Sequence, residues 1–521
     1  MDGPSLDSTR EAVATLESVV HTAIAHLSKR PIDDQQVVAY DLAHAASAVS
    51  AARALLDYAN QGEAQTRLCA AFVADVAHDI ASRLVGRHQH WGVAPEALND
   101  LNGFMAAGRD PEFLTTLVDG APSQLDPDME LASQTFRRFA NEHIAPQAEH
   151  VHRSNDDVPE ALISGLAELG VFGLSVPAEY GGFAEGGSND YLAMVVATEE
   201  LSRGSLGIGG SLITRPEILA RALLAGGTED QKQRWLPQLA SGAVMAAVAV
   251  TEPDYGSDVA AVRVGATRHP DGGWVINGTK TWCTFAGRAD VLMLLARTEP
   301  GTDNHRGLSV FIVEKPRYPG HSFDLAQPDG GRMTAQAIDT IGYRGMHSYE
   351  VAFDNWRVPD DSLIGGEDGR GRGFYYQMEG FENGRLQTAA RAVGVMQAAY
   401  EAAVAYAQDR VVFGATVADF QLTQVKLARM AVLIQAARQF SLHVARLMGD
   451  GDGTLEASMV KAYVCRAAEW VTREAMQIHG GMGYAEEYAV SRYFVDARVL
   501  SIFEGADETL CLKVIARRLL G

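Results

Sequence analysis

The stretch of the chain that most suggests chemistry is SIFEGADETL, residues 501–510, near the C-terminal end. It places a carboxylate, Glu504, directly after the apolar pair Ile502 and Phe503 and before a glycine. Glu504 could begin a helix, because the exposed N–H groups of a helix N-terminus stabilise acidic side chains. It could instead be a catalytic base, since apolar neighbours that exclude water raise the pKa of a carboxylate. From this stretch alone the helix start is favoured, because catalytic carboxylates are rarer than helix caps.

Two glycine-rich stretches invite comparison with dinucleotide-binding loops: 202–212 (SRGSLGIGGSL) and 369–374 (GRGRGF). Such a loop needs the spacing GxGxxG directly after a strand, so that a pyrophosphate meets a helix N-terminus. The first stretch has neither the spacing nor a preceding strand, and the second fails the same test. A Rossmann-type cofactor site is therefore not expected.

Five further segments carry a resemblance to a known family. In chain order they are AVAVTEPDYGSD (247–258), INGTKTWCTFAG (276–287), DRVVFG (409–414), QIHGGMGY (477–484) and FEGADETL (503–510). Together they resemble the landmarks of the acyl-CoA dehydrogenases, from about residue 125 to the end of the chain. One such motif would carry little weight, whereas five in the same order make the resemblance strong.

The resemblance implies an FAD cofactor, held between a β domain and C-terminal helices and shared across a subunit boundary. A flavin that accepts a hydride gains negative charge on its ring, which preorganised donors stabilise. Trp282 is expected against the flavin ring, Thr284 near N5 and Arg410 at the pyrophosphate. Without the surrounding motifs, Trp282 would be interpreted as a core aromatic residue and Arg410 as a solvated charge on a helix. The implied cofactor residues are Val250, Thr251, Gly256, Ser257, Trp282, Cys283, Thr284, Arg410, Phe413, Gln421, Gln477, Gly480, Gly481 and Gly505.

The same resemblance makes Glu504 the catalytic base. The reaction removes the α-proton of an acyl-CoA while the β-hydride passes to the flavin. Some relatives carry their base in the segment that matches FENGR (381–385), at the place of Gly384, which has no side chain to serve as a base. Within the flavin motifs, the base is therefore favoured over the helix start for Glu504. The residues expected along the substrate are Ser257, Arg215, Glu382, Gly384 and Arg385.

Departures from common relatives narrow the expected substrate. Residues 505–507 read Gly-Ala-Asp instead of Gly-Thr-Ser, and the Asp507 carboxylate is expected close to the CoA path. The N-terminal extension, together with residues 197–219, 281–298, 338–350 and 503–520, resembles members that oxidise (2S)-methylsuccinyl-CoA to mesaconyl-CoA in the ethylmalonyl-CoA pathway. The free carboxylate of that substrate needs a cation when buried, for which Arg215 is nominated against the alternative of a surface or helix-start arginine. Glycines 207, 209 and 210 are expected to leave room for the branch, and further polar candidates are His347, Tyr349 and Tyr375.

Other functions remain open. The same machinery could act on another short or branched acyl-CoA, or pass electrons to oxygen as an oxidase. Least favoured is a non-catalytic protein on this fold that binds flavin and contacts DNA, because a net charge of −22 repels nucleic acid and anionic membranes. The expected electron acceptor is an electron-transferring flavoprotein. The expected assembly is a homo-oligomer, a dimer rather than a tetramer, because the extension would cover the face that pairs dimers.

The elements that must position these residues follow from hydrophobic periodicity. Residues 1–122 are expected to form a helical extension. In it, Leu68, Phe72, Val76, Ile80 and Leu84 recur every four residues, and a second, antiparallel helix covers 37–59 with Val38, Leu42, Val49 and Leu56 inward. Val118–Asp128, with a glycine and two prolines, is expected to be a linker.

Beyond the linker the expected fold class is α+β, with segregated layers. Residues 123–245 are expected as a helical N-terminal domain and 361–521 as a C-terminal helical bundle. Between them, residues 246–360 change to period two and predict an antiparallel β domain. In it, Asn277-Gly278 is the expected hairpin turn of GWVINGTKTW.

The cysteines and the chain ends suggest a cytoplasmic protein. Four cysteines, Cys69, Cys283, Cys465 and Cys511, show no CxxC spacing, so neither a metal site nor a redox dithiol is expected. The N-terminal residues are acidic and polar, unlike a secretory signal. No run of about 18 uncharged apolar residues predicts a membrane span.

Overall fold

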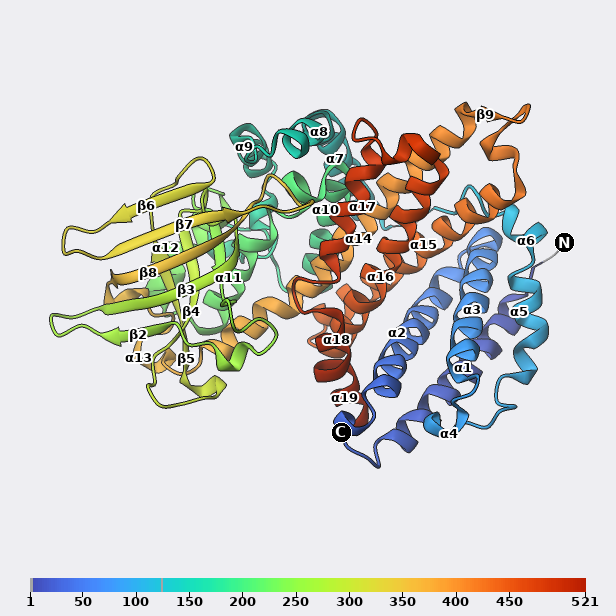
Figure 1. The fold of residues 1–521 in the computed structure, drawn as a ribbon, viewed down its shortest axis with the longest axis horizontal. Helices are drawn as coiled ribbons and strands as arrows, with labels where there is room; N and C mark the ends of the chain where they lie inside the picture. The colour runs from blue at the N-terminus through green and yellow to red at the C-terminus, as the bar shows by residue number, and fades with distance from the viewer. Residues whose placement is uncertain (1–2, 123–124) are drawn as a thin grey trace. The chain divides into compact units, whose positions relative to one another are not determined.

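The computed structural model describes residues 3–122 and 125–521, which form two compact units (Figure 1). Unit 1 combines the two ends of the chain, up to Ala132 and from Thr388 onward. Unit 2 spans Ser133–Gln387. The boundaries fall inside α7 (Pro127–Phe139) and the long α14 (Gly373–Asp409).

Unit 1 is helical apart from one small hairpin. Its first helices are α1 (Leu6–Leu27), α2 (Gln36–Ala59), α3 (Glu63–Leu84), α4 (His88–Trp91), α5 (Asn102–Gly108) and α6 (Pro111–Thr115). Its later elements are β9 (Val411–Val412), β10 (Ala415–Thr416), α15 (Gln421–Gly449), α16 (Thr454–Ile478), α17 (Ala489–Leu500), α18 (Asp507–Thr509) and α19 (Ala516–Leu520).

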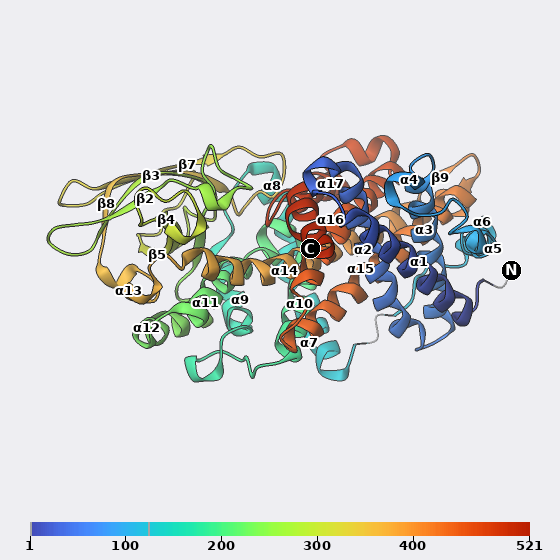
Figure 2. The same ribbon diagram turned by 90° about the horizontal axis from the view of Figure 1, so that it is seen from below.

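Helix α2 is the centre of unit 1. It packs against α1 and α3 on one side and against α15 and α16 on the other, as Figures 1 and 2 show. Its many buried alanines allow this, because small side chains let helices approach closely from several directions. The stripe predicted on α3 is buried from Leu68 to Leu84, and three residues join α2 to α3, so the expected antiparallel helix pair is confirmed. The helical extension thus shares one core with the C-terminal helices.

Unit 2 combines helices with one large sheet. Its helices are α8 (Ala145–Ser154), α9 (Glu160–Glu168), α10 (Ser188–Gly204), α11 (Thr214–Gly226), α12 (Glu229–Ala240) and α13 (Gly366–Gly369). Its strands are β1 (Ala246–Ala249), β2 (Gly265–Arg268), β3 (Trp274–Thr284), β4 (Val291–Arg297), β5 (Leu308–Glu314), β6 (Ser322–Ala326), β7 (Arg332–Ile338) and β8 (Ser348–Val358). They follow the order β1-β4-β2-β3-β8-β7-β6, with β5 paired to β4.

The core of unit 2 lies between this sheet and two helices. Apolar side chains of α11 and α12, among them Leu219, Leu223 and Leu236, pack with Met293 of β4 and Val310 of β5. Strands β4 and β5 are buried along almost their whole length, which explains why both read as continuous apolar runs in the sequence. Figure 2 shows α11 and α12 beneath the sheet.

Two details of the predicted β domain are different in the structure. The sheet is mixed, because β1 and β2 both run parallel to β4 while the other pairs are antiparallel. The predicted turn at Asn277-Gly278 is wrong: both residues lie inside β3, where the pairing with β8 shifts register and the Asn277 Oδ1 accepts the Asn355 N–H at 2.8 Å. Gly278, with φ of 125°, supplies a bulge instead of a turn, and the β2–β3 connection uses Gly272-Gly273.

Other expectations concern the linker, the thiols and the membrane. The described residues between α6 and α7 form no helix or strand, although α7 already begins at Pro127; residues 123–124 lie outside the described part. All four cysteines are buried free thiols. Within the described residues, no helix is both long enough and apolar enough to cross a membrane.

Candidate active site

Two of the expected flavin-binding segments meet at a buried ion pair in unit 2. Lys280 of β3 donates from Nζ to a carboxylate oxygen of Glu252 at 2.8 Å and to the carbonyl oxygen of Val250 at 2.7 Å. The Glu252 carboxylate also accepts the backbone N–H groups of Arg263 and Val264, at 2.7 and 2.8 Å. Burial lowers the pKa of Lys280 to about 8, although Glu252 opposes this effect. Because a buried charge needs such partners, the pair holds the two segments together.

A backbone contact continues this junction toward the expected flavin residues. The Thr281 N–H donates to the Thr251 carbonyl oxygen at 2.8 Å. We call residues 250–252 and 280–284 the strand corner. Thr251 and Val250 therefore lie beside the strand that carries the KTWCT residues, as the flavin interpretation requires. The expected flavin residues Gly256 and Ser257 lie exposed in the turn that follows Glu252.

Trp282 leaves the plane of the sheet at a bulge. The β3–β8 pairing shifts register between Lys280 and Cys283, and Trp282 adopts a positive φ of 57°. Its side chain is consequently 54% exposed, while Cys283 is fully buried and Thr284 places its hydroxyl 2.9 Å from that of Ser348. An exposed indole beside ordered backbone and hydroxyl groups suits a planar aromatic ring. The residues of the strand corner thus fit a flavin.

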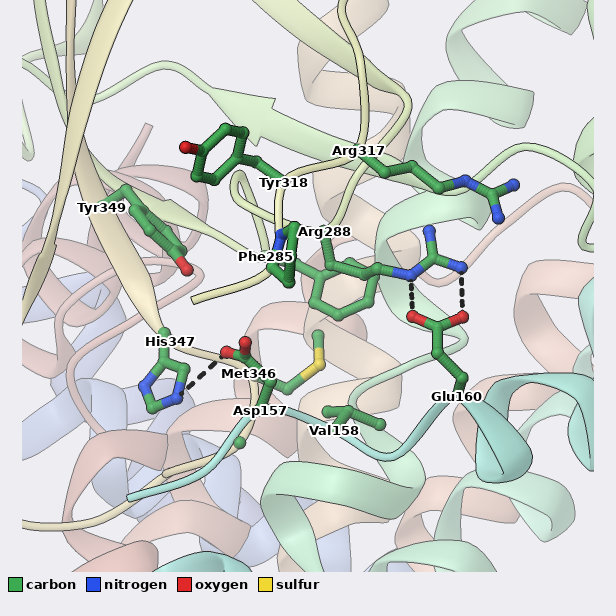
Figure 3. Close-up of a pocket in the computed structure, with 12 residues that line it drawn as sticks. Asp157, Val158, Glu160, Phe285, Arg288, Arg317, Tyr318, Met346, His347 and Tyr349 are labelled. Carbon is green, nitrogen blue, oxygen red and sulfur yellow. Dashed lines mark hydrogen bonds and ion pairs between the residues drawn. The ribbon is translucent and has the colours of Figure 1, made fainter. Parts of the chain in front are cut away.

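A cavity of about 250 Å³ begins immediately after the strand corner (Figure 3). Phe285 forms one wall, and its N–H donates to the carbonyl oxygen of His347 at 2.8 Å. An Arg288–Glu160 ion pair borders it on one side, and His347 lies 3.4 Å from Asp157 on another. Ligand pockets usually measure about 300–1,000 Å³, so this cavity is too small for the whole cofactor. The other lining residues are Val158, Arg317, Tyr318, Pro319, Gly345, Met346 and Tyr349.

Of the three spare polar candidates, His347 and Tyr349 line this cavity (Figure 3) and Tyr375 lies elsewhere in unit 2. Burial, and next the neighbouring His321, lower the pKa of His347, so its ring in the cavity is neutral at neutral pH. The Tyr349 hydroxyl donates to the carbonyl oxygen of Gly320 at 2.9 Å. Tyr375 is half exposed and lies 3.1 Å from a ring nitrogen of His305. The hydroxyls of both tyrosines thus already have partners within unit 2.

The substrate-side candidates lie on α11 and α14. Arg215 is 5% exposed, which excludes the alternative of a surface arginine. It is the second residue of α11, so the alternative of a helix-start arginine describes its position correctly. The residues of FENGR (381–385) lie in the third and fourth turns of α14. Glu217, one half-turn after Arg215, accepts hydrogen bonds from the amides of Asn383 and Gln387. This network joins the two helices and brings the expected substrate segments together.

The expected role of the preceding glycines is wrong. Residues 206–210 form a buried π-helical turn before α11. A Cβ on Gly207 would lie 2.3 Å from the Arg344 carbonyl oxygen, and one on Gly209 would lie 2.3 Å from the Leu201 carbonyl oxygen. These glycines allow close packing against the backbone of unit 2 itself, so they do not provide space for a branched substrate.

The expected base lies in an irregular segment of unit 1. We call residues 501–507, between α17 and α18, the base segment. Glu504 is half-buried and has a positive φ of 54°, followed by Gly505 at 102°. Lys461 of α16 donates from Nζ to the Gly505 carbonyl oxygen at 2.6 Å. Glu504 therefore precedes a helix, as the first interpretation supposed, but its backbone is not that of a helix cap.

One expectation for this segment is wrong. The Asp507 carboxylate was expected near the CoA path, but it is buried against α2 of the extension, where it accepts a hydrogen bond from Tyr40 at 2.5 Å. Its i+4 neighbour Cys511 and the ring of His44 complete this contact. Asp507, one of the two departures from Gly-Thr-Ser, thus contacts the extension.

The residues expected at the distal end of FAD are exposed in unit 1. Arg410 lies between the end of α14 and the start of the β9–β10 hairpin. The tip of this hairpin is Phe413, which is 98% exposed with φ of 53°. Gln421, also exposed, is the first residue of α15. Phe413 is thus an apolar ring held in solvent at the tip of a tight hairpin. Three further expected residues lie exposed at the end of α16 and just beyond it: Gln477, Gly480 and Gly481.

Sequence reasoning missed the residues that hold the site together. Lys280 and Glu252 had a detectable signal, since Lys280 occupies an inward position of an apolar strand. Glu217 had a weaker one, as a carboxylate in the apolar run RPEILARALL. Tyr40 and His44 had none, because nothing near them in the chain indicates a partner more than 460 residues away.

Comparisons with known proteins agree with this geometry. Residues 126–243, 247–356 and 371–520 match the N-terminal, middle and C-terminal domains of the acyl-CoA dehydrogenase family models. The chain is 46% identical over 399 residues to (2S)-methylsuccinyl-CoA dehydrogenase of Cereibacter sphaeroides, covering 76% of this chain and 70% of that protein. It is 36% identical over 400 residues to the mitochondrial 2-methylacyl-CoA dehydrogenase of Solanum tuberosum, covering 76% and 91%.

Solved structures give the same result. Butyryl-CoA dehydrogenase from Megasphaera elsdenii superposes with a TM-score of 0.69 at 30% identity, over 76% of this chain and 99% of that one. A glutaryl-CoA dehydrogenase in complex with glutaryl-CoA gives 0.68 at 31% identity, over 75% and 95%. None of the three family-model matches includes residues 1–125.

Proposed function

The chain belongs to the acyl-CoA dehydrogenase family of FAD-dependent oxidoreductases, and we propose that its substrate is (2S)-methylsuccinyl-CoA, oxidised to mesaconyl-CoA. The observation that carries the proposal is the 46% identity to a relative of that activity, ten points above the 36% of the 2-methylacyl-CoA relative. This substrate would place the enzyme in the ethylmalonyl-CoA pathway, in the cytoplasm.

In the proposed reaction the substrate loses two hydrogens from adjacent carbons. Glu504 takes the α-proton, and bound FAD supplies the acceptor for the β-hydride. Glu504 suits this role because it is half-buried beside Phe503 and fixed by the contacts of the base segment. Gly384, in the other segment where relatives carry a base, cannot take the proton.

The second carboxylate of the substrate needs a buried cation, and we assign this role to Arg215. Arg215 is 5% exposed, and a cation occupies such a buried location only with compensating partners. The hydrogen bonds that Glu217 accepts from Asn383 and Gln387 fix the helix that carries Arg215 against α14. The same helix α14 bears the expected substrate residues Glu382, Gly384 and Arg385. A dicarboxylyl-CoA would bring a carboxylate to this buried cation, which a neutral acyl group would not.

The proposal extends to the electron acceptor and the assembly. An electron-transferring flavoprotein would reoxidise the enzyme, since family members use such an acceptor. The exposed hairpin tip Phe413, with Arg410 and Gln421 beside it, would contact the cofactor of a second copy, so a homo-oligomer, with a dimer favoured, is part of the proposal.

An anaerobic titration of the flavin absorbance tests the substrate. The protein as purified, saturated with FAD, is mixed with methylsuccinyl-CoA, isovaleryl-CoA or butyryl-CoA at equal concentrations. Methylsuccinyl-CoA is expected to bleach the flavin fastest. Faster bleaching by a neutral acyl-CoA would reject the dicarboxylate assignment, and protein that takes up no FAD would reject the proposed chemistry. Admitting oxygen afterwards separates a dehydrogenase, which reoxidises slowly, from an oxidase.

A further inference from the structure

The base segment has a backbone that the rest of unit 1 must hold in place. Glu504 occupies the left-handed region with φ of 54°, which side chains other than glycine rarely adopt. The Asp507 N–H donates to the Ser501 carbonyl oxygen at 3.1 Å and closes the segment into a loop. Conformations of this kind persist only where surrounding contacts impose them. The contacts at the two ends of the loop therefore decide where the Glu504 carboxylate lies.

The C-terminal helices supply some of these contacts. Lys461 of α16 donates to the Gly505 carbonyl oxygen at 2.6 Å. The guanidinium carbon of Arg391, on α14, lies 4.8 Å from the centre of the Phe503 ring, a cation–π contact. Both contacts act on the residues next to Glu504. Neither fixes the end of the loop at Asp507.

The extension fixes that end. Tyr40 and His44, one turn apart on the same face of α2, both contact the same oxygen of Asp507, at 2.5 and 3.1 Å. Cys511, one turn after Asp507, places Sγ 3.4 Å from the His44 ring nitrogen. His44, Asp507 and Cys511 are all buried. We call these four residues, Tyr40, His44, Asp507 and Cys511, the α2 latch.

The charge states of the α2 latch agree with a closed hydrogen-bonded cluster. Burial raises the pKa of Asp507, but the hydrogen bonds from His44 and Tyr40 outweigh it, and the net pKa lies below the ordinary value. Burial lowers the pKa of His44 and raises that of Cys511. At neutral pH the cluster is therefore one carboxylate among neutral partners, two of which donate to it.

We propose that the extension is part of the catalytic apparatus, with Tyr40 and His44 as positioning residues that hold the Glu504 loop through Asp507. The inference rests on the proposed role of Glu504 as the base. The family-model matches begin at residue 126 and so assign no role to residues 1–122. The proposal gives the extension such a role. A displacement of a catalytic group by about 1 Å can slow a reaction by about 10²-fold. A small shift of the loop on loss of the contacts to Asp507, three residues after Glu504, would therefore be enough to affect catalysis.

The test compares two tyrosines of α2. Tyr40→Phe removes a donor of the α2 latch, whereas Tyr58→Phe removes one hydrogen bond of the same kind, to the Pro122 carbonyl oxygen at 2.7 Å, far along the same helix. Asp507→Asn is the second latch variant. Each full-length, FAD-loaded protein is mixed anaerobically with methylsuccinyl-CoA, and the rate constant of flavin reduction and the substrate Kd are measured from pH 6 to 9.

Tyr40→Phe and Asp507→Asn are expected to slow flavin reduction about tenfold or more, with substrate Kd unchanged and with a shifted apparent pKa in the pH–rate profile. Tyr58→Phe is expected to keep the wild-type rate and profile. Wild-type rates and profiles in both latch variants would overturn the positioning role. Equal slowing in Tyr58→Phe would also overturn it, because the effect would then be general destabilisation.

Two further measurements separate this inference from others. Glu504→Gln tests the proposed base by itself: if that variant reduces its flavin normally, the proposed function fails, whatever the latch variants do. The atoms of His44, Asp507 and Cys511 also lie close enough together to ligate a metal ion. Elemental analysis that finds one zinc per chain, lost in Asp507→Asn, would overturn the hydrogen-bonded latch; metal-free, active protein supports it.

Discussion

The strand corner and the base segment each hold a functional side chain in place, but through contacts from different parts of the chain. Each places a functional side chain on a backbone with positive φ, 57° at Trp282 and 54° at Glu504. The strand corner is fixed by partners nearby in the sequence, since Lys280 and Glu252 are 28 residues apart. The base segment is fixed by partners at the other end of the chain, since Tyr40 and Asp507 are 467 residues apart.

The difference shows how each region depends on the rest of the protein. The strand corner needs only the sheet around it, so its residues form motifs that can be recognised in the sequence. The base segment needs the tertiary packing of α2 against the C-terminal helices. Its sequence motif identifies Glu504, but the partners that hold the segment lie elsewhere in the chain: Lys461, Arg391, Tyr40 and His44.

The largest effect is expected from the base itself. Glu504→Gln removes the proton acceptor while keeping the size of the side chain, so the rate of flavin reduction by substrate should fall by about 10²–10⁴-fold. Flavin content and substrate Kd should stay close to those of the wild type. Stopped-flow absorbance under anaerobic conditions measures the rate. A rate within a factor of two of the wild type would place the base elsewhere.

The strand corner should lose stability when its ion pair is broken. Lys280→Met leaves the Glu252 carboxylate buried without its cation, which typically costs about 3–5 kcal/mol. The control is Lys315→Met, because Lys315 is also buried but donates only to carbonyl oxygens. Unfolding in urea should show the larger loss for Lys280→Met, with partial recovery in Lys280→Met/Glu252→Gln. Equal losses at both lysines would show that the ion pair has no special role.

The proposed carboxylate-binding residue should affect one class of substrate only. Arg215→Ala should weaken kcat/KM for methylsuccinyl-CoA by about 2–5 kcal/mol, as expected when a buried charge loses its partner. Its effect on isovaleryl-CoA should be much smaller. The control is Arg221→Ala on the same helix, whose guanidinium binds Glu217 and Tyr191 and should affect both substrates alike. If Arg215→Ala lowers both activities equally, the assignment is wrong.

The smallest expected effect is a dependence of folding stability on pH, caused by His44 of the α2 latch. Burial lowers the pKa of His44 below 6.5, although Asp507 opposes the shift; Arg466 and Arg83 lower it further. Below pH 6.5 the unfolded chain binds a proton that the folded protein excludes, so stability falls as pH falls, by at most about 1.4 kcal/mol per pH unit. Denaturant unfolding of wild type and His44→Gln at pH 7.5, 6.5 and 5.5 measures it. The variant should show the shallower decrease, and parallel curves would contradict the prediction.

The sequence determined much of the fold and the identity of the candidate site. The four-residue spacing from Leu68 to Leu84 is enough to define a buried helical stripe, and the apolar runs at 291–297 and 308–313 are enough to define buried strands. These features are local, because side-chain periodicity follows directly from helix and strand geometry. Motif order likewise led from Trp282 and Glu504 to a flavin enzyme.

Only the tertiary structure decided how these parts are held. Asn277-Gly278 has the sequence of a turn, but pairing with β8 on one side and β2 on the other keeps it inside a strand. The glycines at 207 and 209 allow close backbone packing, which no local pattern reveals. Asp507 turns toward α2 because a buried carboxylate takes the nearest available donors, and those donors come from a helix at the far end of the chain.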